Sequence, residues 1–117
     1  MKVGVVKESA PGETRVAEIA GGQVREFLIR PADAGLEEAP VLALRGGDAG
    51  ENARMAEAVL GGEKGPRRDV VLLNAAAALR VAGQVTTLRA GASCAAEAID
   101  GGRASALLGR VKEALGR

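Results

Sequence analysis

The residues whose types could do chemistry gather in a loop before the longest apolar run of the chain. Lys64, Arg67 and Arg68 form a basic cluster that could contact an anion or an acidic partner through charge-assisted hydrogen bonds. The alternative is a solvated loop, in which Asp69 stabilises the start of the following helix electrostatically. We favour the solvated loop.

A second candidate is the glycine-rich turn GGDAGEN at residues 46–52. Such a turn could cradle a phosphate at a helix N-terminus, but it lacks the lysine of a P-loop and does not match the dinucleotide fingerprint. Asp48 stands three residues before Glu51, which is the spacing of a capping box. Because both carboxylates would repel an anion, the pattern favours a structural cap.

The remaining polar candidates predict no catalytic residue and no metal site. Asn74 is the one uncharged polar residue of the apolar run, and a buried amide needs partners, so we expect it to tie a helix to a loop backbone. Glu8, Glu13 and Glu18 could share a metal only if folding brought them together, since their spacing matches no recognised ligand pattern.

Composition excludes several function classes. The chain has 117 residues with 16 basic and 15 acidic side chains, so no global field attracts nucleic acid or an anionic membrane. It contains no histidine, the commonest general base and metal ligand. Cys94 is its single cysteine, which suits a reducing compartment, and we expect it to be a small buried residue of a helix. With no export signal visible, we predict a cytoplasmic protein.

The apolar run itself, PRRDVVLLNAAAALRVAG at residues 66–83, predicts a central helix. Proline suits the first turn of a helix and glycine suits the position just past its end. A helix that is apolar on nearly every side is buried on nearly every side. We therefore expect this helix to lie at the centre of the core.

The other segments complete an α+β fold. Alternating runs around Gly21-Gly22 predict a β-hairpin, preceded by a short N-terminal strand. Apolar residues at helical spacing, with Thr86 or Thr87 as a cap, predict helices on both sides of the central one. The predicted strands are residues 2–6, 14–19 and 23–29, and the predicted helices are residues 49–60, 66–83, 88–99 and 103–115. We expect one small domain over residues 1–117, with a β-rich region at 1–30 and a helical region of about four α-helices at 46–117.

Residues 14–117 resemble the C-terminal third of anthranilate phosphoribosyltransferase. The resemblance is carried by TRVAEI, by RGGDAGENARMAEAVLGGEKGPRRDVVLLNAAAALRVAG and by AEAIDGGRA. It implies part of a phosphoribosyltransferase α/β domain, from a family that transfers a phosphoribosyl group from a magnesium-bound pyrophosphate donor to anthranilate in tryptophan synthesis. The family's donor motifs lie in its first two-thirds, and its magnesium-binding Asp-Glu pair precedes the hairpin, where this chain reads VKESAPGE. No catalytic residue is carried over, and no cofactor is expected in the isolated chain.

The first 17 residues, MKVGVVKESAPGETRVA, resemble a different pair of families. They are similar to the amino-terminal strand of alanine dehydrogenases and of the nicotinamide nucleotide transhydrogenase alpha subunit. Arg15 matches the arginine that contacts the substrate carboxylate in those dehydrogenases. The chain therefore looks like a chimera of two families.

Three functions follow as hypotheses. The first is a truncated or chimeric phosphoribosyltransferase relative without activity on its own. The second is a small protein–protein interaction module, antitoxin-like or regulatory, that reuses the scaffold. The third is a fragment of an NAD(P)-linked oxidoreductase. In each case we expect a protein partner or a second copy of the chain to cover the apolar helix, and neither nucleic acid nor a membrane as a partner.

Overall fold

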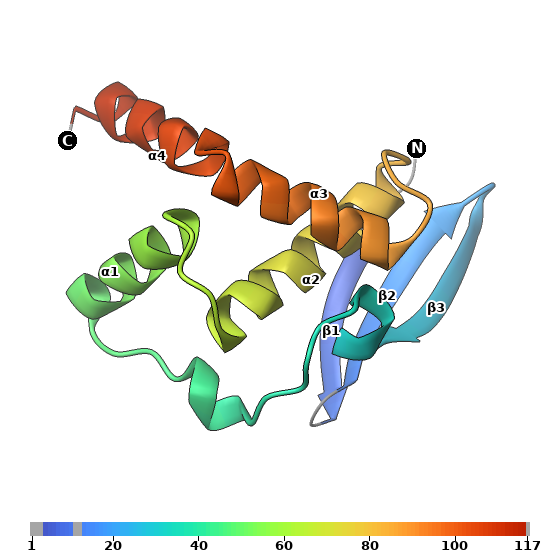
Figure 1. Cartoon of the computed structure of the whole chain (residues 1–117). Coiled ribbons are helices and arrows are strands. Elements are labelled where there is room, and N and C mark those ends of the chain that lie inside the picture. The colour runs from blue at the N-terminus through green and yellow to red at the C-terminus, as the bar shows by residue number, and fades with distance from the viewer. Residues whose placement is uncertain (1–3, 11–12, 117) are drawn as a thin grey trace.

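The computed structural model describes residues 4–10 and 13–116, with side chains at residues 17, 19 and 21–116. A three-stranded sheet comes first and a helical region follows it (Figure 1). The strands are β1 (Gly4–Ala10), β2 (Glu13–Ala20) and β3 (Gln23–Ile29). The α-helices are α1 (Ala49–Leu60), α2 (Pro66–Val81), α3 (Leu88–Asp100) and α4 (Arg103–Ala114). This order confirms the predicted α+β class.

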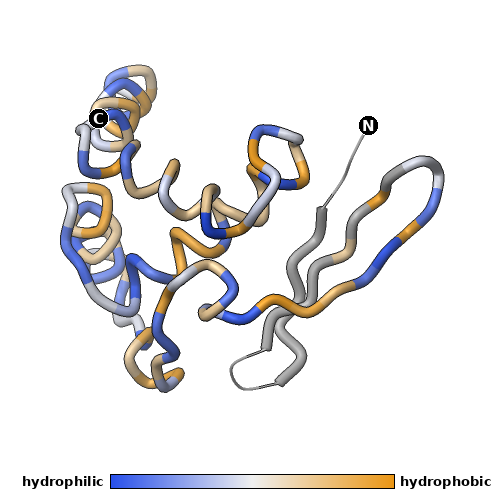
Figure 2. The backbone as a smooth tube through the Cα atoms, turned by 45° about the vertical axis from the view of Figure 1, so that its right-hand side comes forward, coloured by the Kyte–Doolittle hydropathy of each residue, from blue (hydrophilic) through white to orange (hydrophobic). Residues whose placement is uncertain are grey.

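The sheet is antiparallel, with strand order β1-β2-β3. Gly21 and Gly22 connect β2 to β3 with φ angles of 59° and 78°, and two successive residues at positive φ are the signature of a tight hairpin turn. The first strand pairs with β2, which the sequence had left open. The hairpin turn reaches away from the helices (Figure 2).

The core lies where α2 and α3 pack together beside the sheet. Its side chains are almost all small or aliphatic, and Ala76 of α2 is fully buried. The buried cluster consists of Ile29, Ala34, Leu72, Leu73, Ala76, Ala77, Leu88, Ala92 and Ile99. The sole aromatic side chain, Phe27, packs against this cluster, and the guanidinium carbon of Arg80 lies 4.9 Å from its ring centre.

The prediction that the central helix is buried on nearly every side is wrong in part. α2 buries Leu72, Leu73, Ala76, Ala77 and Val81, but Val70 and Val71 are each 39% exposed. Within the described chain, α2 contacts α3, β1, η1 and η2, and these contacts leave Val70 and Val71 partly uncovered. One stripe of this apolar helix is consequently left open to solvent.

Asn74 lies on that open stripe, so its predicted burial is also wrong. Its Nδ2 donates to the Val70 carbonyl oxygen of the same helix at 2.9 Å. A short polar side chain can bond to the carbonyl four residues earlier, and the amide therefore needs no loop partner.

Two smaller expectations differ from the structure. Cys94 is exposed because it lies on the outer side of α3, away from the stripe of Ala92 and Ile99 that enters the core. The segment between the hairpin and the helices, where no strand or helix was predicted, contains the short 3-10 helices η1 (Pro31–Ala34) and η2 (Val41–Leu44). Pro40 precedes η2 directly and is its N-cap.

α1 and α4, the helices at the two ends of the helical region, contact each other through polar side chains. Lys112 of α4 pairs with Glu57 of α1, and the Ser105 hydroxyl donates to the Leu60 carbonyl oxygen at 2.9 Å. α1 stands apart from the sheet on the left of Figure 1. The radius of gyration is 15.1 Å, against about 13 Å for a compact domain of this length. Within the residues that the structure describes, no helix has the length and apolar character needed to cross a membrane.

The contact between α2 and α3 generates a testable prediction at Gly91. A Cβ atom there would lie 2.8 Å from the Ala76 Cα and 3.0 Å from the Ala76 carbonyl oxygen, so Gly91→Ala must push the helices apart. We expect the free energy of unfolding, measured in urea, to fall by about 2–3 kcal/mol.

Gly109 of α4 provides the matched control, because a Cβ atom there meets nothing within 4 Å. Gly109→Ala should raise the free energy of unfolding by about 0.4–1 kcal/mol through helix propensity. Equal effects of the two substitutions would contradict the close helix contact.

Candidate functional site

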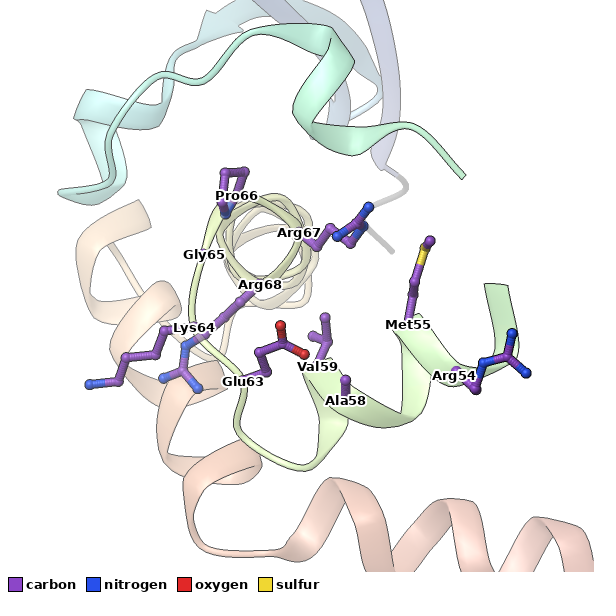
Figure 3. A pocket seen from close by; sticks show the side chains of 10 residues that line it. All are labelled: Arg54, Met55, Ala58, Val59, Glu63, Lys64, Gly65, Pro66, Arg67 and Arg68. Carbon is purple, nitrogen blue, oxygen red and sulfur yellow. The ribbon is translucent and has the colours of Figure 1, made fainter. Parts of the chain in front are cut away.

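A cleft of about 330 Å³ lies between the second half of α1 and the first turn of α2. Its lining is more apolar than polar and also includes charged side chains. Figure 3 shows the lining residues: Arg54, Met55, Ala58, Val59, Glu63, Lys64, Gly65, Pro66, Arg67 and Arg68. The predicted basic cluster therefore borders the cleft that the structure describes.

Glycines shape the loop that forms the cleft. Gly62 and Gly65 have φ angles of 107° and 133°, in a region that residues with a side chain rarely adopt. Pro66 then begins α2, where its fixed φ suits the first helical turn. These residues reverse the chain between α1 and α2 and so place the two helix ends beside each other.

Arg68 forms the strongest polar contact of this region. Its Nη1 and Nη2 donate to Asp100 Oδ1 and Oδ2, at 2.6 and 2.9 Å, in a bidentate pair. The Arg68 side chain is 7% exposed and that of Asp100 is 52% exposed. The hydrogen bond to Arg68 lowers the pKa of Asp100, and the hydrogen bond to Asp100 raises the pKa of Arg68. The pair ties the start of α2 to the end of α3.

The three basic residues do not converge on one point. Lys64 and Arg68 extend to one side of the α2 start, while Arg67 extends to the other side, toward Met55 (Figure 3). Arg67 Nη2 donates to the Arg45 carbonyl oxygen at 3.0 Å. Arg68 is buried and Lys64 is exposed, and the contact of this cluster with an anion or a partner stays a prediction.

The turn GGDAGEN forms a double cap on α1. Asp48 Oδ1 accepts from the Glu51 amide at 2.8 Å, and Glu51 Oε2 accepts from the Asp48 amide at 3.0 Å. Asn52 adds a second closure: its Oδ1 accepts from the Gly47 amide at 2.8 Å and its Nδ2 donates to the Gly47 carbonyl oxygen at 3.0 Å. A Cβ atom on Gly47 would lie 1.6 Å from Glu51 Oε2, so a side chain here would displace the Glu51 carboxylate from the cap.

The sheet register shows where Glu8, Glu13 and Glu18, the glutamates considered as metal ligands, lie. Glu8 lies opposite Thr14, whereas Glu18 lies opposite Gly4. Four residues of strand, about 13 Å, thus separate Glu18 from the end of the sheet where Glu8 and Glu13 lie, and the three side chains fall outside the described part of the structure. Among the side chains that the structure describes, no three His, Cys, Asp or Glu residues gather closely enough to hold a metal.

Arg15 lies in the middle strand, opposite Lys7 of β1 and Leu28 of β3. Its side chain falls outside the described part of the structure. Its predicted contact with a substrate carboxylate stays a prediction.

Comparison with known proteins agrees with this arrangement. The family model described as "Glycosyl transferase family, a/b domain" matches residues 2–105. The chain belongs to this glycosyltransferase family. The match begins at residue 2, so the opening strand is covered by the same family as the rest. The second resemblance, to alanine dehydrogenases, stays a prediction.

Individual members of the glycosyltransferase family resemble the chain closely over part of their length. It is 51% identical over 110 residues to the anthranilate phosphoribosyltransferase of Symbiobacterium thermophilum, and the match covers 94% of this chain and 32% of that enzyme. The enzyme of Methylocella silvestris is 46% identical over 97% of this chain and 33% of its own length.

A solved structure extends the likeness to three dimensions. The crystal structure of anthranilate phosphoribosyltransferase from Thermus thermophilus superposes with a TM-score of 0.76 at 40% identity, over 88% of this chain and 31% of that one. This chain thus spans about a third of the length of the relatives that it matches.

The cap on α1 generates one prediction. Asp48→Ala removes the acceptor of the Glu51 amide and should lower the free energy of unfolding by about 1 kcal/mol. Glu51→Gln is the control, because an amide oxygen can still accept from the Asp48 amide. Urea unfolding followed by far-UV circular dichroism measures both, and an equal loss in the two variants would contradict the cap.

The pair between Arg68 and Asp100 generates a second prediction, in pH dependence. Because folding lowers the pKa of Asp100 from its ordinary 3.8, the pair stabilises the fold above that value. This stabilisation is lost as the pH falls through the lowered pKa. The lowered pKa of Glu57, caused by its bond to Lys112, acts in the same direction.

Asp100→Asn should therefore be less stable than the native chain at pH 7, and its stability should change less between about pH 5 and pH 3. Glu97→Gln, on the same helix, is the control and should keep the native pH profile. Urea titrations at several pH values measure the effect. An unchanged stability of Asp100→Asn at pH 7 would show that the pair contributes nothing.

Proposed function

We propose that this chain supplies the scaffold third of an anthranilate phosphoribosyltransferase of tryptophan biosynthesis, and that it transfers no phosphoribosyl group by itself. The observation that carries this proposal is the combination of close likeness and partial coverage. The fold superposes on 88% of this chain but on only 31% of the solved enzyme chain. As part of the same proposal, we assign the chain to the cytoplasm.

The contacts made by the basic residues near the cleft support the proposal that the chain transfers no phosphoribosyl group by itself. Catalysis on a phosphoryl-bearing donor needs preorganised cationic or amide groups where charge develops. Here the Arg68 guanidinium is occupied by Asp100, and Arg67 donates to the Arg45 backbone. These groups stabilise the chain's own fold and do not converge on a donor.

The size of the surface supports a requirement for further polypeptide. The accessible surface is 7854 Å². A folded monomer of 11.8 kDa is expected to expose about 5,900 Å². The excess, about 1,900 Å², agrees with the radius of gyration of 15.1 Å in showing a chain less compact than a complete domain of its size.

Phosphoribosyl transfer to anthranilate tests the proposal directly. We expect no turnover from the purified chain, and no turnover from the Symbiobacterium thermophilum enzyme after removal of the 110 residues that this chain matches. Co-expression of the two pieces should restore turnover. The complete enzyme, assayed in parallel, provides the positive control.

Two results would contradict the proposal. Turnover by the isolated chain comparable with that of the complete enzyme would disprove the lack of independent activity. No turnover from the co-expressed pieces, although they form a complex, would disprove the catalytic contribution.

The same excess surface favours a second candidate, a small interaction module that reuses this scaffold for regulation. In that case the chain binds a protein partner or a second copy and takes no part in transfer. Light scattering with an apolar dye tests it. A compact monomer that binds no dye would contradict this second function.

A further inference from the structure

We propose that η2 and the first half of α2 form the face through which this chain binds the rest of its family's fold. The η2–α2 face is defined by five exposed apolar residues, namely Val41, Leu42, Leu44, Val70 and Val71. The inference rests on the proposed function and adds to it the surface at which the missing part is bound.

The exposure of these residues is the first argument. Leu42 and Val41 are 78% and 63% exposed, although they lie in a well-formed 3-10 helix. Val70 and Val71 are each 39% exposed on a helix whose other side is in the core. Such a concentration of exposed aliphatic residues on neighbouring elements marks an interaction surface.

The two elements form one continuous face because they are tied together. η2 packs against α2, and Arg67 donates to the carbonyl oxygen of Arg45, the residue that ends η2. Arg67, Val70 and Val71 are three and four residues apart on α2, so they share one side of the helix. The bond from Arg67 therefore places η2 beside the open stripe of α2.

The cleft extends this face toward α1. Arg67 is common to both, and the apolar residues Met55, Val59 and Pro66 also line the cleft; Met55 lies beyond Arg67 in Figure 3. A cleft of about 330 Å³ next to an aliphatic surface can accept one or two apolar side chains of a partner, the arrangement that interface anchors use.

Two facts indicate which polypeptide binds the η2–α2 face. The chain exposes about 1,900 Å² more surface than a compact monomer of its mass, so part of its fold is left uncovered. The relatives that the chain matches are about three times as long, so their fold includes a further two-thirds of polypeptide able to cover it. The occupant is this remaining part of an anthranilate phosphoribosyltransferase.

The experiment measures association between this chain and the Symbiobacterium thermophilum enzyme that lacks its 110 matched residues. The two pieces are co-expressed with an affinity tag on one of them, and the affinity between the purified pieces is then measured by titration. Leu42→Asp and Val71→Asp place a charge on the η2–α2 face. We expect each to weaken association by at least about tenfold, equivalent to about 1.4 kcal/mol.

Leu107→Asp on α4 is the matched control, since Leu107 is 57% exposed and lies outside the face. It should leave the affinity unchanged. If it weakens association while Leu42→Asp and Val71→Asp do not, the face is wrong, although the proposed function survives. If the chain pairs with itself through this face and ignores the enzyme piece, the inference is also overturned.

If the enzyme piece does not fold alone, a covalent graft of this chain into the enzyme tests the same η2–α2 face. This chain replaces the 110 matched residues within the Symbiobacterium thermophilum enzyme. Leu42→Asp, at a residue that is 78% exposed in the isolated chain, should lower the urea midpoint of the graft but leave that of the isolated chain unchanged. Equal effects in both would overturn the docking face, whereas an unfolded, inactive native graft would count against the proposed function itself.

Discussion

The close approach of α2 and α3 at Ala76 and Gly91 is the contact on which the rest of the structure depends. The chain has one aromatic residue, so no large side chain is available to fill space between its layers. The helices must instead come close enough for alanines and leucines to pack at the density of a protein interior. The absence of a side chain at Gly91, where a Cβ atom would lie 2.8 Å from the Ala76 Cα, makes this possible.

The other contacts of the helical region depend on this one. With α2 and α3 in place, the start of α2 and the end of α3 lie side by side, and Arg68 reaches Asp100 in a bidentate pair. The same end of α2 fixes the loop with Gly65 and hence the cleft against α1. Arg67 and Arg68 at the cleft therefore maintain the architecture, while Val70 and Val71 leave an apolar stripe of α2 partly exposed.

The sequence predicted the elements well and their surroundings poorly. Pro66, the alanine-rich run and the spacing of Asp48 and Glu51 are local signals, and the helix ends and capping contacts follow from them. The pair between Arg68 and Asp100 joins residues 32 positions apart, for which no local pattern exists. The exposed stripe with Asn74 was missed for a related reason: an apolar sequence shows that a helix needs cover, but not which side receives it.

The attachment of α1 to the rest of the molecule has a consequence for the order in which the fold opens. α1 is joined to α4 by the Glu57–Lys112 ion pair and by the bond from Ser105 to the Leu60 carbonyl oxygen, and these contacts are exposed. Exposed ion pairs contribute little and weaken with salt. α1 and α4 thus form a peripheral unit that can open while α2, α3 and the sheet remain folded, in the manner of a separate cooperative unit in hydrogen exchange. Its amides should exchange earlier than those of α2, and still earlier at high ionic strength.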